Sequence, residues 1–380
     1  MTALLCLSGL LYLNVTGRVV FSPLLPLLEN EFGLGHGAAG SLFFFQATGY
    51  VAGLFVSGVA AWRLTHHGTI VLSAFGLGVA LLALSSGFSL VTLQAGLVLL
   101  GAAAGLYLPS GIATVTELTA DTQRGRAMAI HELAPGMAFI TAPLAVEAML
   151  RWVSWRMILA TFGLALLTAG CLYYRAGQGG RGGGEPPRLR TLAIMACDGM
   201  LVRIAVLFAL AVALGYGLYA MLPLFLIVER GMNRASANTL LGLSRVLALP
   251  MVFAAGWLAD RFGHRRALLA FQATTGALTV GLALVPAGVL TACAVVLQAA
   301  ASVCFFPPCY SMVTQLVAPA RRHLAVSIVS IAGIFIGAGL APSFIGYLAQ
   351  AWSFAGAKFL LGAAALASPG LLTSYAGRTH

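Results

Sequence analysis

The sequence predicts an all-α membrane protein whose twelve transmembrane helices form two six-helix bundles related by a pseudo-two-fold axis. Three observations lead to this fold class. Of the 380 residues, 60% are hydrophobic and only 8% are charged, whereas soluble domains carry about 25% charged residues. Apolar stretches of about 20 residues recur along the whole chain, and each is long enough to cross a bilayer as a helix. The third observation is a repeat, described below, that relates the two halves of the chain.

The apolar stretches define twelve candidate spans in the order of the chain. They are 3–28, 38–61, 69–88, 90–117, 127–150, 154–174, 199–227, 236–258, 266–286, 288–317, 324–350 and 354–376. The longest polar gap, residues 175–190, is rich in glycine and proline, which do not hold a helix, so we expect a flexible linker there. We therefore expect an N-terminal bundle over 1–174, a linker over 175–198 and a C-terminal bundle over 199–380.

Positive charge orients the spans in the membrane. Thirteen arginines fall in the gaps after even-numbered spans and at the C-terminus: Arg63, Arg124, Arg126, Arg175, Arg181, Arg188, Arg190, Arg261, Arg265, Arg266, Arg321, Arg322 and Arg378. Five positive residues fall on the opposite side: Arg151, Arg156, Arg230, Arg234 and Lys358. Because cytoplasmic loops carry the excess of positive residues, we expect a multi-pass protein of the cell (inner) membrane with both termini and the linker in the cytoplasm.

The two halves of the chain repeat at a shift of 198 residues without a gap. The shift superimposes Gly58 on Gly256, Arg63 on Arg261, His66 on His264, Pro109 on Pro307, Arg124 on Arg322, Ala127 on Ala325 and Ile130 on Ile328. One register that holds over two separate regions is hard to obtain by chance, so it indicates two parallel six-helix repeats.

The gap between the eighth and ninth spans carries a distinctive loop, residues 256–266, which read G-W-L-A-D-R-F-G-H-R-R. It resembles the loop signature of the major facilitator superfamily, G-x-x-x-D-R-x-G-R-R, with His264 in place of the usual basic residue. Gly263 permits a positive φ in a tight turn, and Asp260 can cap the incoming helix or pair with an arginine. The resemblance implies a transporter that works by alternating access between the two bundles, with Gly256, Asp260, Arg261 and Gly263 in a gate.

The first-half copy of this loop, residues 58–68, is degraded. Trp62 stands where the signature has its aspartate, and Thr65 stands where it has its second glycine. The gate of the N-terminal bundle must therefore be made differently. Glu117, near Arg124 and Arg126 at the end of the fourth span, is a substitute partner for Arg63. The alternative is an ordinary surface ion pair.

Two arginines lie deep inside predicted spans, where a charge is expensive and so tends to mark a substrate or ion path. Arg18 lies in the first span and Arg245 in the eighth. Arg18 precedes Pro26 by eight residues, a spacing similar to that in the organic-anion antiporters of the superfamily. The organophosphate antiporters have a second arginine in the seventh span. It is absent here, because the equivalent position is Gly215 or Tyr216. We expect Arg18 and Arg245 to bind a small organic anion; the alternative for Arg18 is an arginine that reaches the interface or pairs with a neighbouring helix.

Other polar side chains complete the expected path. His131 and Glu132 lie one turn into the fifth span and can carry a coupling proton, because histidine titrates near physiological pH. The alternative is that Glu132 pairs with Arg124 or Arg126 at the gate. Neutral side chains that can contact a substrate, although each alone more often only packs, are Gln46, Tyr50, Tyr107, Tyr216, Tyr219 and Tyr310.

Several functional classes are disfavoured. The sequence has no phosphate-binding loop, nucleotide-binding domain or H-E-x-x-H motif, and its six cysteines show no metal-binding spacing. We therefore expect no enzyme, cofactor, metal or nucleic-acid partner, but a monomer in membrane lipid that couples transport to protons or to exchange. Two alternatives stay open: an exporter of amphipathic or hydrophobic compounds, which the replacement of the drug-antiporter Gly-Pro by Ala142-Pro143 disfavours, and a non-transporting receptor or scaffold.

Overall fold

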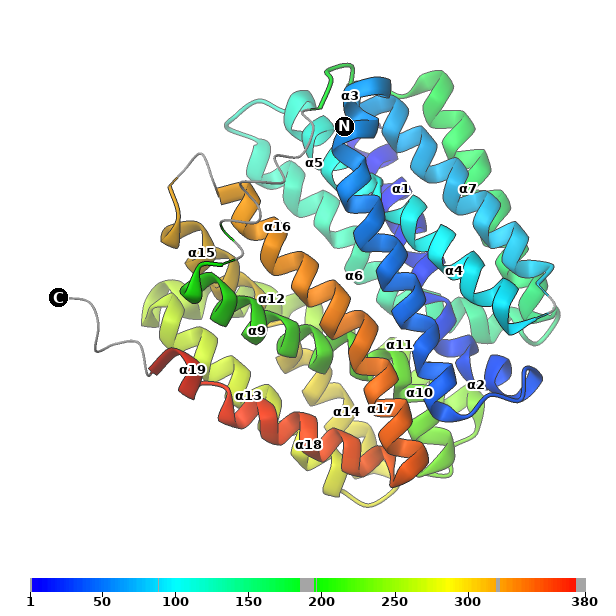
Figure 1. Ribbon diagram of the computed structural model, residues 1–380, viewed down its shortest axis with the longest axis vertical. Coiled ribbons are helices and arrows are strands. Elements are labelled where there is room, and N and C mark those ends of the chain that lie inside the picture. Colours follow the sequence, from blue (N-terminus) through cyan, green and yellow to red (C-terminus); the bar gives the residue numbers. More distant parts are fainter. Residues whose placement is uncertain (1, 88, 185–194, 196, 319–321, 374–380) are drawn as a thin grey trace. The chain divides into compact units, whose positions relative to one another are not determined.

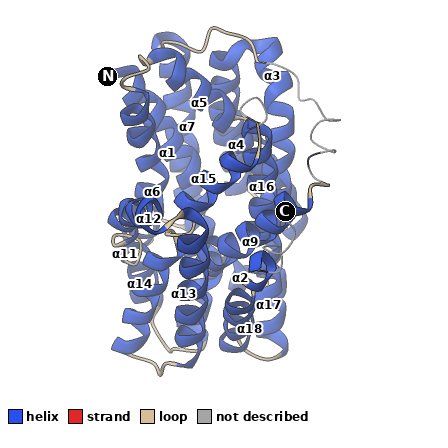
Figure 2. Ribbon diagram, turned by 90° about the vertical axis from the view of Figure 1, so that its left-hand side faces the viewer, coloured by secondary structure: helices blue, strands red, loops and turns tan. Residues whose placement is uncertain are grey.

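The computed structural model describes residues 2–87, 89–184, 195, 197–318 and 322–373, and these residues form helices joined by short loops, without a strand (Figures 1 and 2). Within this part, ten helical stretches are long and apolar enough to cross a membrane, and Phe354–Ala367 is a shorter apolar helix. The longest stretch, His36–Ser85, joins two predicted spans across a kink at Thr65. The described chain is thus an all-α, multi-pass membrane protein.

The chain divides into two compact units, and each is described by itself. Unit 1 comprises Met1–Phe32 and Phe45–Pro187, and unit 2 comprises Gly33–Phe44 and Arg188–His380. Parts of the predicted linker (185–194 and 196), and with them Arg188 and Arg190, lie outside the described residues, as do Arg321 and Arg378.

The helices that belong to unit 1 come first in the chain. They are α1 (Thr2–Val19), α2 (Phe21–Glu31), α3 (His36–Ser85, from Phe45 onward), α4 (Leu90–Gly105), α5 (Tyr107–Leu118), α6 (Arg124–Met149) and α7 (Trp155–Ala176). Unit 2 also contains two π-helical segments. Its elements are α9 (Gly199–Val212), η1 (Ala213–Gly217), α10 (Leu218–Val228), α11 (Arg234–Leu243), α12 (Ala248–Phe262), α13 (His264–Leu284), α14 (Val289–Ser302), α15 (Phe306–Leu316), α16 (Arg322–Ala332), η3 (Gly333–Leu340), α17 (Ala341–Ala351), α18 (Phe354–Ala367) and α19 (Gly370–Thr373).

Several spans are broken in mid-course, and prolines explain where. A proline lacks the N–H that would bond the carbonyl four residues earlier, and its ring clashes with that carbonyl. Counting back four from Pro23 and Pro109 reaches Val19, the last residue of α1, and Gly105, the last residue of α4. The same count from Pro307 reaches Val303, the C-terminal cap of α14. These three breaks are therefore encoded locally.

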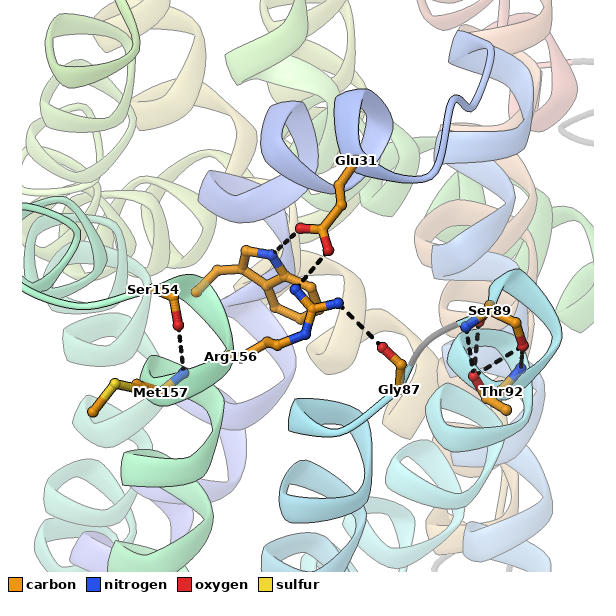
Figure 3. Close-up of polar contacts among 8 residues, drawn as sticks. Glu31, Gly87, Ser89, Thr92, Ser154, Arg156 and Met157 are labelled. Carbon is orange, nitrogen blue, oxygen red and sulfur yellow. Dashed lines mark hydrogen bonds and ion pairs between the residues drawn. The ribbon is translucent and has the colours of Figure 1, made fainter.

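At the end of unit 1 away from the linker, Glu31 holds together the ends of three helices (Figure 3). Its carboxylate accepts a hydrogen bond from the Trp155 indole N–H at 2.5 Å and pairs with Arg156 at 2.5 Å. The Arg156 guanidinium also donates to the carbonyl of Gly87, just after α3, at 3.4 Å. The end of α2 is thereby joined to the start of α7 and to the end of α3.

Unit 2 contains an equivalent arrangement, because the shift of 198 residues carries Glu31 onto Glu229. The Glu229 carboxylate accepts hydrogen bonds from the N–H groups of Phe354 and Ala355, in the first turn of α18. The neighbouring Arg230 donates to the carbonyl of Ala283, near the end of α13, at 3.1 Å. We call these two arrangements the Glu31 clamp and the Glu229 clamp.

Replacing Glu229 with alanine tests the second clamp. The change removes the acceptor of two N–H groups that open a helix, and unpaired donors of this kind cost about 1–3 kcal/mol. We expect the apparent Tm of the detergent-purified protein to fall accordingly. Asp121→Ala is the control, because Asp121 also pairs with an arginine, Arg124, but its side chain is 87% exposed. Equal losses of Tm in the two variants would show that the clamp contributes no more than a surface pair.

Candidate functional site

Arg18 of unit 1 lies beside the break between α1 and α2, well inside the stretch Thr2–Glu31. Its guanidinium carbon lies 4.5 Å from the ring centre of Tyr50 on α3. The Gln46 side-chain amide, one turn earlier on α3, donates to the Arg18 carbonyl at 3.2 Å. Arg18 is half-buried, and its Nε has no hydrogen-bond partner among the described residues. The structure thus brings three of the predicted binding residues together.

Arg245 of unit 2 lies in the four-residue turn between α11 and α12. One guanidinium nitrogen donates to the carbonyl of Gly215 at 2.6 Å, and the guanidinium carbon lies 4.8 Å from the ring centre of Tyr219. Gly215 belongs to the π-helical turn η1. The Gln298 amide donates to the adjacent Leu214 carbonyl at 2.9 Å. A π turn departs from the regular hydrogen-bond pattern of an α-helix and often occurs at functional sites. In η1 the carbonyls of Leu214 and Gly215 accept hydrogen bonds from side chains.

The two arginines share one contact, a tyrosine ring under the guanidinium, and the helices that carry the arginine and the tyrosine are exchanged between the units. In unit 1 the arginine is on the first helix of the bundle and its tyrosine on the second, whereas in unit 2 the arginine is on the second and the tyrosine on the first. An aromatic ring stabilises a guanidinium by contact with the flat face of the cation. The N–H groups of the guanidinium lie in its own plane, and carboxylate and phosphate groups bind them in that plane. Each unit therefore contains a group suited to an anion.

His131 forms a third cluster together with Tyr107 and Glu132. The His131 ring is fully buried; its Nε2 lies 3.2 Å from the Tyr107 hydroxyl, and its Nδ1 lies 3.5 Å from a Glu132 carboxylate oxygen. Tyr107, which we expected beside a substrate, lies here instead. The alternative was that Glu132 pairs with Arg124 or Arg126. Among the described ion pairs, Arg124 pairs with Asp121 at 2.5 Å, and Glu132 lies beside His131. The three residues thus form one cluster of titratable side chains.

The remaining predicted aromatic residues lie in different surroundings. Tyr216, in η1, is half-buried and interacts electrostatically with Tyr219. Tyr310 is exposed and packs edge-on against Phe208, with ring centres 5.5 Å apart, in an aromatic cluster that includes Phe305. Tyr216 thus belongs to the neighbourhood of Arg245, whereas Tyr310 belongs to a packing cluster in which the Phe208 ring lies between other rings.

The loop 256–266 forms the tight turn expected of it. Gly263 ends α12 with φ of 88°, and α13 begins at His264. Asp260 does not cap α13, whose start has no side-chain cap, because the turn leaves this carboxylate on an exposed face of α12. Arg261 lies over the ring of Trp257, with its guanidinium carbon 5.5 Å from the ring centre. Gly256 has no neighbouring side chain within reach of an added Cβ.

Thr65 takes the position of Gly263 in the degraded first loop, and it also takes a backbone conformation reserved for glycine. Its φ is 65° and its ψ is 169°, and it is the one positive-φ residue other than glycine within the described chain. A β-branched residue in this region is strained. The geometry of the turn is thus retained even though the glycine is lost.

Glu117 does not pair with Arg63 as expected. Its carboxylate accepts a hydrogen bond from the N–H of Gly180 at 2.9 Å. Arg63 instead lies over Trp62, 5.9 Å from the ring centre. The reason is that the first part of the predicted linker docks on unit 1 and brings a backbone donor to Glu117.

We call residues 177–184 the strap. The N–H of His67 donates to the Gly180 carbonyl at 2.7 Å, and the N–H of His66 donates to the Gly182 carbonyl at 3.1 Å. The His67 ring stacks on Tyr173 with the centres 4.7 Å apart. Gly180 has φ of 70°, and a Cβ there would lie 2.7 Å from the Thr114 hydroxyl oxygen. Glycine is therefore required at position 180 for the close fit of the strap, whereas composition predicts only a flexible linker there.

Sequence reasoning missed the residues of the two clamps and the burial of Lys358. The signal for the clamps was present, because the same 198-residue shift that relates the loops also pairs Glu31 with Glu229. Lys358, expected near a membrane surface, is fully buried with its Nζ 3.3 Å from the ring centre of Phe225. A contact between a cation and a ring leaves no pattern in the sequence. Within the described residues, no group of three or more histidine, cysteine or acidic side chains is placed to hold a metal ion.

Comparison with known proteins adds independent findings. The family model described as Major Facilitator Superfamily matches residues 7–296 and 205–378. No curated protein sequence matches the chain. Among solved structures, a bacterial homologue of the human lysosomal transporter Spinster is similar with a TM-score of 0.78 and 16% identity, covering 98% of this chain and 94% of that one. A mutant of the nucleoside transporter NupG gives 0.81 at 13% identity, covering 98% and 100%. A D-xylose–proton symporter gives 0.75 at 17% identity, covering 98% and 96%.

Replacing Thr65 with glycine should stabilise the protein. The change relieves a conformation that costs a non-glycine residue about 1–3 kcal/mol, and only part of this gain is lost to the greater entropy of glycine in the unfolded chain. We expect the free energy of unfolding to rise by about 1 kcal/mol, measured as a higher apparent Tm. Thr65→Ala is the matched control, since it removes the hydroxyl and keeps the Cβ. If alanine stabilised as much as glycine, backbone strain would not be the cause.

Replacing Gly180 with alanine should release the strap. The new methyl group would collide with Thr114 and with the backbone nitrogen of His67, 2.9 Å away, and the positive φ would add strain. We expect faster tryptic cleavage after Arg181. Gly182→Ala is the control, because a Cβ at Gly182 meets nothing within 4 Å. Equal cleavage rates in the two variants would mean that the strap is not held by this fit.

Proposed function

This chain belongs to the major facilitator superfamily and is a transporter rather than an enzyme, and we propose that its cargo is a small organic anion, a carboxylate or a similar group. The observation that carries this proposal is that each bundle holds one guanidinium inside a membrane span, over a tyrosine ring. The solved structures that the chain resembles are named for chemically different cargoes, and at such low identity they bear on the fold alone. The choice of cargo therefore rests on the two arginines.

Arg18 makes no ion pair with a carboxylate in the described part of the chain, and its Nε, which can donate a hydrogen bond, has no partner there. Two of the contacts of Arg245, with a carbonyl and with a phenol ring, are to uncharged groups. Positive charge in a membrane interior is costly. An anion with two oxygens relieves that cost by forming two charge-assisted hydrogen bonds with one guanidinium.

The energy source we propose is the proton gradient, acting through His131 and Glu132. The two side chains meet at 3.5 Å, one fully buried and the other 57% exposed. An imidazole beside a carboxylate is a common proton acceptor near neutral pH. Alternating access between the two bundles would then expose this site to the two sides of the membrane in turn, as either symport or exchange.

The proposed orientation places both termini and the strap on the cytoplasmic side of the inner membrane. Its basis is that thirteen arginines fall on that side of the spans and five positive residues on the other. On that side lie two turns of equivalent geometry. We assign gating to the loop that contains Gly256, Asp260, Arg261 and Gly263 in unit 2. In unit 1 the corresponding gate consists of Arg63, Glu117 and Arg124 together with the strap.

Uptake by reconstituted protein tests the cargo. Purified protein in liposomes is screened with radiolabelled carboxylates and phosphates under an imposed pH gradient. We expect Arg18→Ala and Arg245→Ala each to reduce uptake of the cargo at least about tenfold, because truncating one partner of a buried charge pair costs about 2–5 kcal/mol. Lysine at either position should restore part of the uptake, since it keeps the charge and loses the planar fork.

Arg175→Ala is the matched control for these variants, because Arg175 is exposed in the last turn of α7. Its uptake should equal that of the unmodified protein. Full uptake by both Arg18→Ala and Arg245→Ala would refute the anion proposal. Recognition of lipophilic cations alone would favour an exporter of amphipathic compounds instead.

A further inference from the structure

The hydroxyl of Tyr107 determines which nitrogen of His131 is free to take up a proton. The hydroxyl lies 2.6 Å from the backbone carbonyl of Leu7 on α1. A carbonyl can only accept, so the single hydroxyl proton of Tyr107 is directed to Leu7. The same hydroxyl oxygen lies 3.2 Å from His131 Nε2. With its proton already donated, this oxygen can only accept, and Nε2 must therefore carry a hydrogen.

This arrangement fixes the tautomer of His131. A neutral imidazole has one N–H and one bare nitrogen, so a hydrogen on Nε2 leaves the lone pair on Nδ1. Nδ1 is buried and has no hydrogen-bond partner, and it lies 3.5 Å from the Glu132 carboxylate. A lone pair opposite a carboxylate is unfavourable. One added proton converts the pair into an imidazolium and a carboxylate joined by a charge-assisted hydrogen bond.

We propose that Tyr107 is the positioning residue of a one-proton site, in which it holds His131 as the Nε2–H tautomer so that the transported proton binds between Nδ1 and Glu132. This inference rests on the proposed function, and it specifies how the proton site of that function works. In the protonation step a proton adds to the lone pair of His131 Nδ1 and no bond within the protein breaks. The Glu132 carboxylate neutralises the new positive charge. Deprotonation reverses it.

The surroundings of the site suit this role. The rings of Tyr107 and His131 are nearly parallel, 7° apart, and both are buried. The Glu132 side chain is 57% exposed, so a proton can reach His131 Nδ1 by way of the Glu132 carboxylate. The other titratable groups that face the pair are Tyr173 of α7, which interacts with Tyr107, and beyond Tyr173 the carboxyl group of Glu117 on α5 and the thiol of Cys6 on α1. Of the two carboxyl groups, Glu132 contacts His131 itself at 3.5 Å, whereas Glu117 interacts with Tyr173.

The same hydrogen bond connects the proton site to the cargo site. Leu7 and Arg18 belong to one helix, α1. A movement of α1 that accompanies cargo binding would lengthen the bond between Tyr107 and the Leu7 carbonyl. The hydroxyl could then donate to His131 Nε2, which would favour the other tautomer and place a hydrogen on Nδ1. Cargo and proton would thereby influence each other through one buried hydroxyl.

The test is ¹⁵N NMR of full-length protein with labelled histidine in lipid nanodiscs, together with the pH dependence of cargo uptake. The His131 signals are assigned by their loss in His131→Asn. We expect the neutral His131 of the unmodified protein to be the Nε2–H tautomer, with Nδ1 gaining a hydrogen on acidification. In Tyr107→Phe the neutral ring should shift toward Nδ1–H, which can bond Glu132 without an added proton. The midpoint of uptake should then move to lower pH by about half a unit to one unit.

Tyr173→Phe is the matched control, because it removes a neighbouring buried hydroxyl that has no hydrogen-bond partner and leaves His131 untouched. It should change neither the tautomer nor the midpoint. If Tyr107→Phe behaved like this control while His131→Asn abolished the pH dependence, the role of Tyr107 would be wrong and the proton site would stand. If His131→Asn and Glu132→Gln both kept normal pH dependence, the proton site itself would be wrong, and this inference with it.

Discussion

A positive charge inside a membrane helix has to be stabilised without water, and the arrangement around Arg18 and Arg245 follows from that constraint. Each guanidinium lies over a tyrosine ring, which stabilises its face, and each lies where the helical backbone is interrupted. The interruptions matter because the backbone carbonyls of a regular helix already accept hydrogen bonds from N–H groups of the same helix. A carbonyl at an interruption can accept from a side chain instead. A π turn gives the Gly215 carbonyl to Arg245, and the side chain of Gln46 holds the break beside Arg18. A guanidinium can form in-plane, charge-assisted hydrogen bonds with an anion, which is the basis of the anion proposal.

The two bundles reach equivalent structures with exchanged residues. The arginine and its tyrosine swap helices between the units. The Glu31 clamp binds α7 through an indole and a guanidinium, whereas the Glu229 clamp binds α18 through two backbone N–H groups. Gly263 forms the turn of unit 2 without strain, whereas Thr65 forms the corresponding turn of unit 1 in a strained backbone conformation. The repeat therefore preserves geometry more strictly than it preserves residue types. Unit 1 also has the strap docked beside its altered loop, in contact with Glu117, the residue expected to compensate for the missing aspartate.

Much of the fold was predictable because its signals are local. The length of the apolar runs locates the spans, and the Asp-Arg-x-Gly pattern locates the tight turn at Gly263. Three of the breaks lie four residues before a proline, although other prolines, such as Pro135 and Pro143, lie inside an unbroken helix. The residues that failed to follow prediction depend on contacts between distant segments. The partner of Glu117 is a backbone N–H of Gly180, which no side-chain pattern announces. Tyr107 was expected to contact a substrate, and only its distances to Leu7 and His131 reveal its hydrogen bonds. Lys358 looked like a surface charge until its contact with Phe225 was seen.

The central claim is that two guanidinium groups, one in each bundle, recognise an anion directly. The measurement that tests it most directly is an experimental structure of the protein with its transported carboxylate bound. The account predicts a cargo oxygen within hydrogen-bond distance of at least one of these guanidinium groups, with the tyrosine contact of that arginine retained. A cargo bound away from both groups, with each guanidinium paired to a carboxylate side chain of the protein, would contradict it.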